Sequence, residues 1–372
     1  MKNNKKLKKN KKTILTIANE KKCDKCEKKY EIILAYGPHK FCEKHFVEFF
    51  ENRIRKTIRK YNLIAPQEKI LIALSGGKDS TTILHILAKY YKKGREIEAI
   101  IIDEGVKGYR EKAVKKAIEN CKKLGIKHHL VKFEKEFGIT NDTLMPILKN
   151  NPKLGGTCSF CGVLRRNIMN KYAKKLKCQK LVTGHNLDDE TQSFVMNIFN
   201  NDYERMKRMG ASAGIIKHTG FVKRIKPLYE TPEKEIIAYC AYKNIKHYSE
   251  ECCPYSYTAK RNEYREMLNN FEDRFPGTQY SILRFYENLK NDIKKINEKE
   301  NKKKNKNEKQ KNESVLKECE KCKEPTERKL CKACEMIEKI KLEKKFPNTN
   351  TSKKFFEKNK NKKLTCAITK RY

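Results

Sequence analysis

Residues 69–80, KILIALSGGKDS, constrain the fold most, because they join an apolar strand to a helix through two glycines. The run 70–74 is rich in leucine and β-branched residues, which is typical of a strand buried in a parallel sheet. After the strand, Gly76 and Gly77 let backbone N–H groups approach an oxyanion, and a helix that opens at Ser80 favours negative charge at its N-terminus. The stretch predicts a phosphate-binding turn, although plain connections between a strand and a helix also use glycine.

Strand and helix patterns alternate along the central part of the chain. Repeated βα units predict an α/β fold with a doubly wound parallel sheet, whose ligand lies at the carboxyl ends of the strands. Asp103 stands at such an end, where it could hold a ribose hydroxyl or a metal, or simply cap a turn. Residues 138–157 show little periodicity, and residues 203–220 are expected to form a basic loop. Further strands are expected at 97–102, 128–133 and 180–183, and helices at 80–92, 109–124, 158–176 and 187–200.

Cysteines and one histidine form two sets with paired two-residue gaps. The chain has 15 cysteines and no recognisable secretory signal, which favours metal ligands over disulfides. The spacing of each set suits a closed tetrahedral site for structural zinc. The N-terminal set is Cys23, Cys26, Cys42 and His45, and the C-terminal set is Cys319, Cys322, Cys331 and Cys334.

Two further thiols, Cys158 and Cys161, lie at the expected start of a helix in the string CSFCGVLRR. At this spacing both can point the same way, and the helix dipole is expected to lower the pKa of each thiol. Two thiols supply half of a site, so a partner is needed. Cys252 and Cys253 lie in a segment that precedes a proline turn. Core positions are expected for Cys121, Cys178 and Cys240.

The string LVTGHNLDDE predicts a second strand end, which carries His185, Asp188 and Asp189. Acidic side chains near a polyphosphate could hold magnesium or activate an acceptor group. Asp188 could instead be the N-cap of the next helix. Residues 257–274 mix lysine and arginine with tyrosine and phenylalanine, which suits RNA contact, although a surface helix with an apolar seam gives the same pattern.

The chain is strongly basic, with a formal net charge of +41 over 372 residues. Lysine-rich stretches carry only part of this charge, so a nucleic acid partner is expected. No apolar run approaches the roughly 20 residues that cross a bilayer, so no membrane contact is expected and the protein is predicted to be cytosolic. The expected segments are a disordered arm at 1–22, a zinc module with its connecting helix at 23–62, the α/β domain at 63–293, a lysine-rich linker at 294–315, a zinc ribbon at 316–336 and a basic tail at 337–372.

Taken together, these motifs resemble those of the tRNA 2-thiouridine synthetases of the TtuA type and their wobble-uridine relatives, within the PP-loop ATP pyrophosphatases. The matching strings are SGGKDS, IIDEG, CSFCGVLRR, TGHNLDDE and CPYS, beside the two zinc sets. The resemblance runs from about Cys23 to Cys334. It implies a PP-loop domain of the HUP-like class, flanked by zinc modules.

The resemblance also implies a [4Fe–4S] cluster, which Cys158, Cys161 and Cys253 would hold through three irons. The fourth iron would be left free to hold a sulfur atom. The family's third ligand directly precedes the proline, which selects Cys253. The neighbouring thiol of Cys252 could compete for this role.

By the same resemblance, ATP would adenylate the C2 oxygen of a tRNA uridine, and sulfide would then attack C2 as AMP leaves. Lys78 and the amides of the turn would hold phosphate, and Asp79 would help to hold Mg²⁺. Asp189 matches a position credited with activating the uridine, and Arg165 is a cation near the cluster. The implied nucleotide site comprises Ala73, Ser75, Gly76, Gly77, Lys78, Asp79, Ser80, Asp103, Gly184, His185 and Asp189.

The implied partners are tRNA and a sulfur donor, either sulfide or a ubiquitin-like thiocarboxylate carrier, and the chain could form a homodimer. Three other functions remain open. A persulfide enzyme would use Cys158 or Cys161 with Cys253 as a redox pair and need no iron. A PP-loop ligase for a small molecule would leave the zinc sets and the basic charge unexplained. A zinc-ribbon protein could bind RNA without catalysis.

Overall fold

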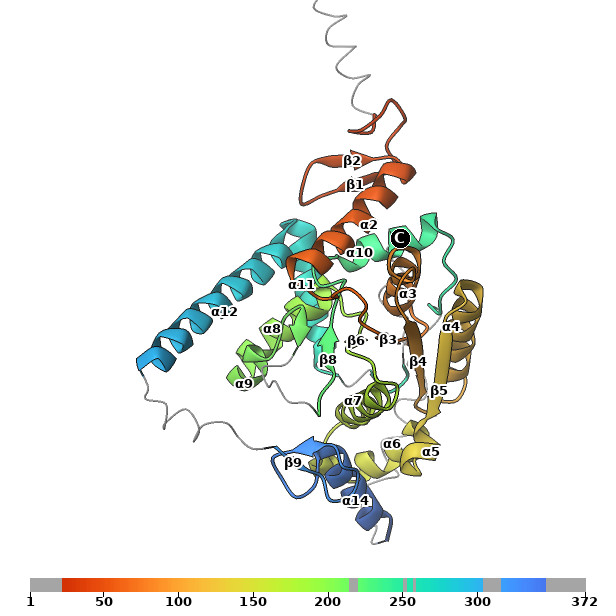
Figure 1. Cartoon of the computed structure of the whole chain (residues 1–372), viewed down its shortest axis with the longest axis vertical. Coiled ribbons are helices and arrows are strands. Elements are labelled where there is room, and N and C mark those ends of the chain that lie inside the picture. The colour runs from red at the N-terminus through yellow and green to blue at the C-terminus, as the bar shows by residue number, and fades with distance from the viewer. Residues whose placement is uncertain (1–21, 214–219, 250–252, 257–258, 304–315, 346–372) are drawn as a thin grey trace, which may run out of the picture.

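The core of the molecule is a six-stranded sheet with the strand order β5-β4-β3-β6-β8-β7. The computed structural model describes residues 22–213, 220–249, 253–256, 259–303 and 316–345 (Figure 1). Neighbouring strands from β5 to β8 run parallel, and only the edge strand β7 is antiparallel. The predicted doubly wound parallel sheet is confirmed. The strands are β3 Ile70–Ala73, β4 Ile97–Asp103, β5 Lys127–Lys132, β6 Lys180–Val182, β7 Ser212–Ala213 and β8 Lys223–Ile225.

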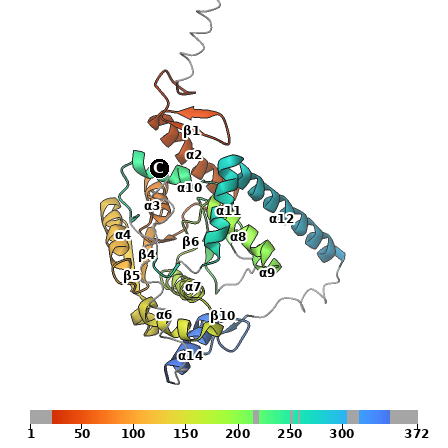
Figure 2. The same cartoon turned by 180° about the vertical axis from the view of Figure 1, so that it is seen from behind.

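Helices cover both faces of this sheet (Figures 1 and 2). Side chains alternate across strand β3, so Ile70 and Ile72 enter one apolar core while Leu71 enters the other. The first core includes α2 Glu43–Lys60, α3 Lys78–Tyr91, α4 Arg110–Leu124 and α10 Glu233–Tyr242; the second includes α6 Asn141–Asn150, α7 Thr157–Lys175 and α14 Lys332–Lys345.

Strands β3 and β6 are neighbours in the sheet, although two βα units separate them in the sequence. The chain moves from β3 to β4 and β5 on one side, then returns to β6 on the other. Ligands of doubly wound sheets bind at the carboxyl ends of the strands where the order reverses. The glycine turn and the TGHN segment therefore lie side by side at the carboxyl edge of the sheet.

The remaining helices stand beside the sheet. Helix α12 packs along α8, where Phe194, Met209 and Tyr286 form a small apolar cluster. The remaining helices are α5 Phe133–Phe137, η1 Pro152–Leu154, α8 Leu187–Phe199, α9 Tyr203–Lys207, α11 Arg261–Arg274 and α12 Thr278–Lys303.

Each of the two cysteine-rich modules contains one short hairpin. The N-terminal hairpin pairs β1 Ile32–Leu34 with β2 His39–Phe41, and the C-terminal one pairs β9 Lys317–Glu318 with β10 Pro325–Thr326.

Several expectations about element bounds were wrong. Helix α3 begins at Lys78, not at Ser80, because Gly77 is its N-cap. The stretch 138–157 contains helix α6, which a capping box at Thr140 initiates. Helix α12 continues to Lys303 inside the expected linker, since lysine and glutamate favour helix. The expected tail begins with helical residues, among which Ile340 is fully buried.

Two short elements, α9 and β7, lie in the expected loop 203–220, of which residues 214–219 are outside the described part. Residues 1–21 and 346–372 of the expected arm and tail are also outside it. Cys121, Cys178 and Cys240 are buried, as expected for core residues. In the described part of the chain, no helix combines the length and apolar character of a bilayer-spanning segment.

Candidate active site

The glycine turn follows β3 and leads directly into α3. Gly76 has φ of +89°, and an added Cβ would lie 2.1 Å from the carbonyl oxygen of Ala113 in α4. The carbonyl of Gly76 accepts a 2.9 Å hydrogen bond from the amide of Tyr248. Inside the turn, the Ser75 and Ser80 hydroxyl oxygens are 2.9 Å apart. The turn is therefore held on both sides, with the N-terminus of α3 open to an anion.

The second predicted strand end meets the first. Gly184, after β6, lies so close to the first turn of α3 that an added Cβ would be 2.8 Å from the Ser80 amide nitrogen. His185 follows, and its Nδ1 lies 2.9 Å from the Thr183 hydroxyl. The two motifs that sequence analysis assigned to one pocket are thus in contact.

Lys78 and Asp79 open α3 and contact each other, with the Lys78 Nζ 3.1 Å from Asp79 Oδ2. Glu233, at the start of α10, is the second carboxylate on Lys78. Burial opposes the lysine charge, but Asp79 and Glu233 outweigh it and raise the pKa of Lys78. Burial raises the pKa of Asp79. Sequence reasoning missed Glu233, although the string TPEKE marks a helix start with an acidic first turn.

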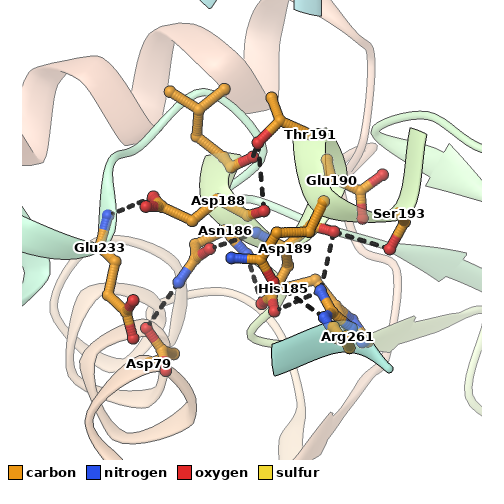
Figure 3. Close-up of polar contacts among 12 residues, drawn as sticks. Asp79, His185, Asn186, Asp188, Asp189, Glu190, Thr191, Ser193, Glu233 and Arg261 are labelled. Carbon is orange, nitrogen blue, oxygen red and sulfur yellow. Dashed lines mark hydrogen bonds and ion pairs between the residues drawn. The ribbon is translucent and has the colours of Figure 1, made fainter. Parts of the chain in front are cut away.

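The residue that caps α8 is Asn186, and the expectation that Asp188 does so was wrong. The Asn186 side chain accepts a hydrogen bond from the Asp189 amide, and the Asp189 carboxylate accepts one from the Asn186 amide (Figure 3). The side-chain Nδ2 of Asn186 donates to Asp79 Oδ1 at 3.0 Å. One side chain therefore joins the first turns of α3 and α8.

Asp188 points away from this cap. Its carboxylate accepts hydrogen bonds from the Glu233 amide at 2.7 Å and from Gln279 Nε2 at 3.0 Å. Burial raises the pKa of Asp188 to about 7, and the charge of Glu233 adds to the effect. Asp188 fixes α10 and α12 onto α8, which is a structural role.

Asp189 is held by Arg261, the first residue of α11. The Arg261 Nη2 donates to both Asp189 Oδ1 and the Asp189 carbonyl at 2.8 Å, and its Nε donates to Gln192 (Figure 3). Burial would raise the carboxylate pKa, but Arg261 and His185 outweigh it, so the pKa of Asp189 is lowered. Arg261 belongs to the segment expected to contact RNA, and its guanidinium instead points into the site.

The three thiols of the expected cluster site come together from two parts of the chain. Cys158 and Cys161 occupy the first turns of α7, and Cys158 Sγ lies 3.7 Å from the Tyr255 carbonyl in the turn that follows Cys253. Burial is the largest cause that raises the pKa of Cys253. The charges of Cys161 and Cys158 add to it, so Cys253 lies near both. Cys252 lies outside the described residues.

The thiol pKa values differ from the sequence expectation. A lowered pKa was predicted for Cys158 and Cys161 from the helix dipole, and this was wrong. Burial raises the pKa of both thiols, and Arg165 offsets only part of that effect. A bound cation would reverse this balance, because coordination deprotonates a thiol.

An ion network connects these thiols to the glycine turn, and Arg110 and Glu104 within it are buried. Arg110 donates to the Ser75 carbonyl at 2.6 Å and pairs with Glu104 at 2.6 Å. The other Glu104 oxygen lies 3.6 Å from Arg165 Nη1. The chain of contacts runs from the turn through Arg110 and Glu104 to the cation beside the thiols, and sequence reasoning identified only its last member.

Two other predicted site residues lie at the carboxyl edge of the sheet. Asp103 ends β4, and its Oδ1 accepts a 3.0 Å hydrogen bond from the Gly105 amide. This is the turn-capping alternative, while its second oxygen leaves a ligand role open. Ala73 ends β3 and is partly buried.

Both predicted zinc sets are assembled. In each set, the four ligand atoms all lie within 4.8 Å of one another. Cys26 and Cys42 sulfurs are 3.8 Å apart, and Cys322 and Cys331 sulfurs are 3.4 Å apart. Tetrahedral zinc with bonds of about 2.3 Å needs sulfurs roughly 3.8 Å apart. The donor sets and their spacing therefore fit one tetrahedral metal ion each.

The C-terminal module rests on the helix that carries two of the thiols. Glu324, almost fully buried, pairs with Lys174 of α7 at 3.2 Å and accepts a hydrogen bond from Asn170. Asn170 also accepts a 2.9 Å hydrogen bond from the Val222 amide. The module thus braces α7 from the side opposite the strands.

Replacing Cys331 by serine is expected to release this module, because ligand-bound metal supplies most of the folding energy of such small units. Hydrogen exchange should accelerate in peptides covering residues 316–345, and also around Asn170, which loses its Glu324 contact. The Cys178→Ala variant removes a buried thiol outside the metal sets and is expected to leave both regions protected. Unchanged protection in the Cys331 variant would show that the module folds without metal.

Comparisons with known proteins agree with this geometry. A family model described as a PP-loop domain matches residues 46–271. The tRNA 2-thiolation protein NcsA of Haloferax volcanii is 35% identical over 331 residues, which cover 86% of this chain and 98% of that protein. The tRNA-5-methyluridine(54) 2-sulfurtransferase of Pyrococcus horikoshii is 35% identical over 314 residues, covering 84% and 92%. The solved structure of the U34-tRNA thiolase NcsA from Methanococcus maripaludis with its [4Fe-4S] cluster has a TM-score of 0.65 at 35% identity, covering 73% of this chain and 88% of that one.

Proposed function

The chain belongs to the PP-loop family of tRNA 2-thiolation proteins, and from this premise we propose that it is an ATP-dependent tRNA uridine 2-sulfurtransferase. The observation that carries the proposal is a set of contacts between groups that lie far apart in the sequence. The phosphate-binding turn leads into α3, which touches the segment that carries the ionised Asp189, and an ion network through Arg110, Glu104 and Arg165 runs from the turn toward the three thiols. A small-molecule ligase would need no such thiols, and an RNA-binding protein without catalysis would need no such turn.

In the first step, the uridine C2 oxygen attacks the α phosphorus of ATP and pyrophosphate leaves. The turn amides and Lys78 bind the phosphates, and Mg²⁺ would take the place of Lys78 beside Asp79, whose raised pKa a cation would lower. Asp189 is ionised and accepts a hydrogen bond from the uridine, which polarises the base toward attack. Positive groups around phosphorus offset the charge that develops there.

In the second step, sulfur attacks C2, the C2–O bond breaks and AMP leaves with the original oxygen. Cys158, Cys161 and Cys253 would be the three protein ligands of a [4Fe–4S] cluster, and the positive charge of Arg165 would act on Cys161 and Cys253. When bound, the cluster would supply an open iron that holds inorganic sulfur near C2. The two tetrahedral sets would hold structural zinc.

Single thiol variants separate the two steps. In Cys253→Ala, tRNA-dependent exchange of pyrophosphate with ATP is expected to continue, while formation of 2-thiouridine falls to background, because only the sulfur step needs that thiol. Cys121→Ala, which alters a buried thiol in the core, and Cys252→Ala are expected to keep both activities. The measurements are ATP/pyrophosphate exchange and mass spectrometry of nucleosides, mapped to their position in tRNA.

The same preparations discriminate among the remaining functions. The cluster predicts a brown anaerobic protein with about four irons per chain. A colourless protein that still forms 2-thiouridine would instead favour persulfide chemistry. If wild-type protein catalyses no ATP/pyrophosphate exchange with any unmodified tRNA, the sulfurtransferase proposal is wrong and binding without catalysis takes its place.

A further inference from the structure

Asn141, the first residue of α6, places its side-chain amide against one of the proposed cluster ligands. Its Nδ2 lies 3.4 Å from Cys161 Sγ, which is within hydrogen-bonding distance for sulfur. Asn141 is 3% exposed. Its Oδ1 is also buried and has no hydrogen-bond partner among the described residues. The thiol is therefore the side chain's one hydrogen-bonding contact in that part of the structure.

Helix capping does not explain this amide. The N-cap of α6 is Thr140, whose hydroxyl accepts from the Thr143 amide while Thr143 completes the capping box. Asn141 comes one position later, where a side chain contributes little to the cap. A buried polar group without such a role is costly unless it is hydrogen-bonded. The sulfur is what makes asparagine suitable at this position.

The backbone around Asn141 is fixed independently of its side chain. The Asn141 amide nitrogen donates to the Glu104 carbonyl at 2.7 Å, and the Asp142 amide donates to the Gly105 carbonyl at 3.3 Å. The Asp142 carboxylate accepts a 2.5 Å hydrogen bond from Tyr255, in the turn after Cys253. The start of α6 therefore touches both halves of the thiol site and is held to the end of β4.

The direction of the hydrogen bond depends on the state of the sulfur. A thiol can donate to Oδ1 or accept from Nδ2, whereas a thiolate can only accept. A cysteine that ligates iron is a thiolate, so Nδ2 must face it. Donors to cluster sulfurs stabilise added negative charge, which raises the reduction potential.

We propose that Asn141 is a positioning residue that donates an N–H···S hydrogen bond to Cys161 when this cysteine ligates the iron–sulfur cluster, and so raises the potential of the cluster. The inference rests on the proposed cluster and adds a residue that neither the motifs nor the resemblance assigned. The hydrogen bond would stabilise negative charge on the cluster, and such stabilisation matters for a site that receives anionic sulfur.

The test is a redox titration of the anaerobic holoprotein, followed by its visible absorbance and electron paramagnetic resonance. Asn141→Leu keeps the volume of the side chain and removes the donor, and it is expected to shift the reduction equilibrium about tenfold, which is about 59 mV toward lower potential for one electron. Asn141→Asp keeps the shape, replaces the donor by an acceptor, and should shift it in the same direction. Iron content and thermal unfolding identify variants that fold and load the cluster.

Thr143→Val is the matched control on the same helix. It breaks the capping box without touching the thiol, so the potential should stay at the wild-type value. An unchanged potential in both Asn141 variants overturns the inference, and so does an equal shift in Thr143→Val, which would assign the effect to movement of α6. Wild-type protein that takes up no iron would instead refute the proposed cluster, so the two failures are distinguishable.

Discussion

Asp189→Asn is expected to lower tRNA-dependent ATP/pyrophosphate exchange by about 10³-fold, which is within the usual range for a positioned carboxylate that acts on a reacting group. Arg261 donates once to the Asp189 carboxylate and once to the Asp189 main-chain carbonyl, and its positive charge keeps the carboxylate ionised. An asparagine amide would present a donor to groups that already donate, the Arg261 guanidinium or the Asn186 amide. The substitution therefore removes the charge and disturbs its neighbours. Asp202→Asn, at the N-cap of α9, is the matched control and should keep full activity, since both residues cap helices well.

Arg261→Met provides a readout that a structural effect alone would not give. Without the guanidinium, burial dominates and the pKa of Asp189 rises. The carboxylate is then protonated at a higher pH, so the acid limb of the pH profile of ATP/pyrophosphate exchange should move to higher pH than in wild type. Should Asp189→Asn retain wild-type ATP/pyrophosphate exchange, or Arg261→Met keep the wild-type pH profile, Asp189 has no part in adenylation.

Gly76→Ala is expected to abolish ATP binding and to cost about 3 kcal/mol or more of folding stability, as the sum of overpacking and a left-handed backbone. The new Cβ would be 2.1 Å from the Ala113 carbonyl oxygen. That atom belongs to the backbone of α4, so no side-chain rotation relieves the contact. The turn must move away from α4, and its amides then no longer converge on a phosphate. Urea unfolding and equilibrium binding of ATP measure the two effects separately.

Gly94→Ala is the control for this experiment. Gly94 has a similar φ of +80°, but nothing lies within 4 Å of an added Cβ. The Gly94→Ala variant should therefore lose only the cost of a left-handed backbone, about 1–2 kcal/mol of folding stability. Its ATP binding should be unchanged. If Gly76→Ala proves no more costly than Gly94→Ala and binds ATP normally, the close packing of the turn on α4 does not shape the phosphate site.

The contacts of Lys78 indicate how the binding of nucleotide and the binding of Mg²⁺ should depend on each other. Two carboxylates, Asp79 and Glu233, now neutralise this lysine. A polyphosphate that arrives with Mg²⁺ supplies both a new partner for the lysine and a cation for Asp79. Binding of the nucleotide and of the metal ion should therefore be mutually supportive, while either one alone leaves a buried charge without its partner.

The sequence by itself determined the sheet, the turn and the metal sets, because these depend on local patterns. Apolar runs that alternate with helical periods specify βα units, and a glycine pair after a buried strand specifies a tight turn. Paired two-residue gaps between cysteines likewise identify ligands that lie side by side in any fold. The same local logic correctly placed Cys121, Cys178 and Cys240 in the core.

Only the tertiary structure decided which groups face the reacting atoms. A lone arginine in a basic helix has the same local pattern whether it meets RNA or a carboxylate, and Arg261 turns inward because α11 lies against α8. The thiol pKa depends on burial by residues distant in sequence, so the helix dipole alone gave the wrong direction for Cys158 and Cys161. Asn141 reaches Cys161 only because the end of β4 holds α6 in place. Contacts between distant segments depend on how the elements pack, and no local pattern of residues records that packing.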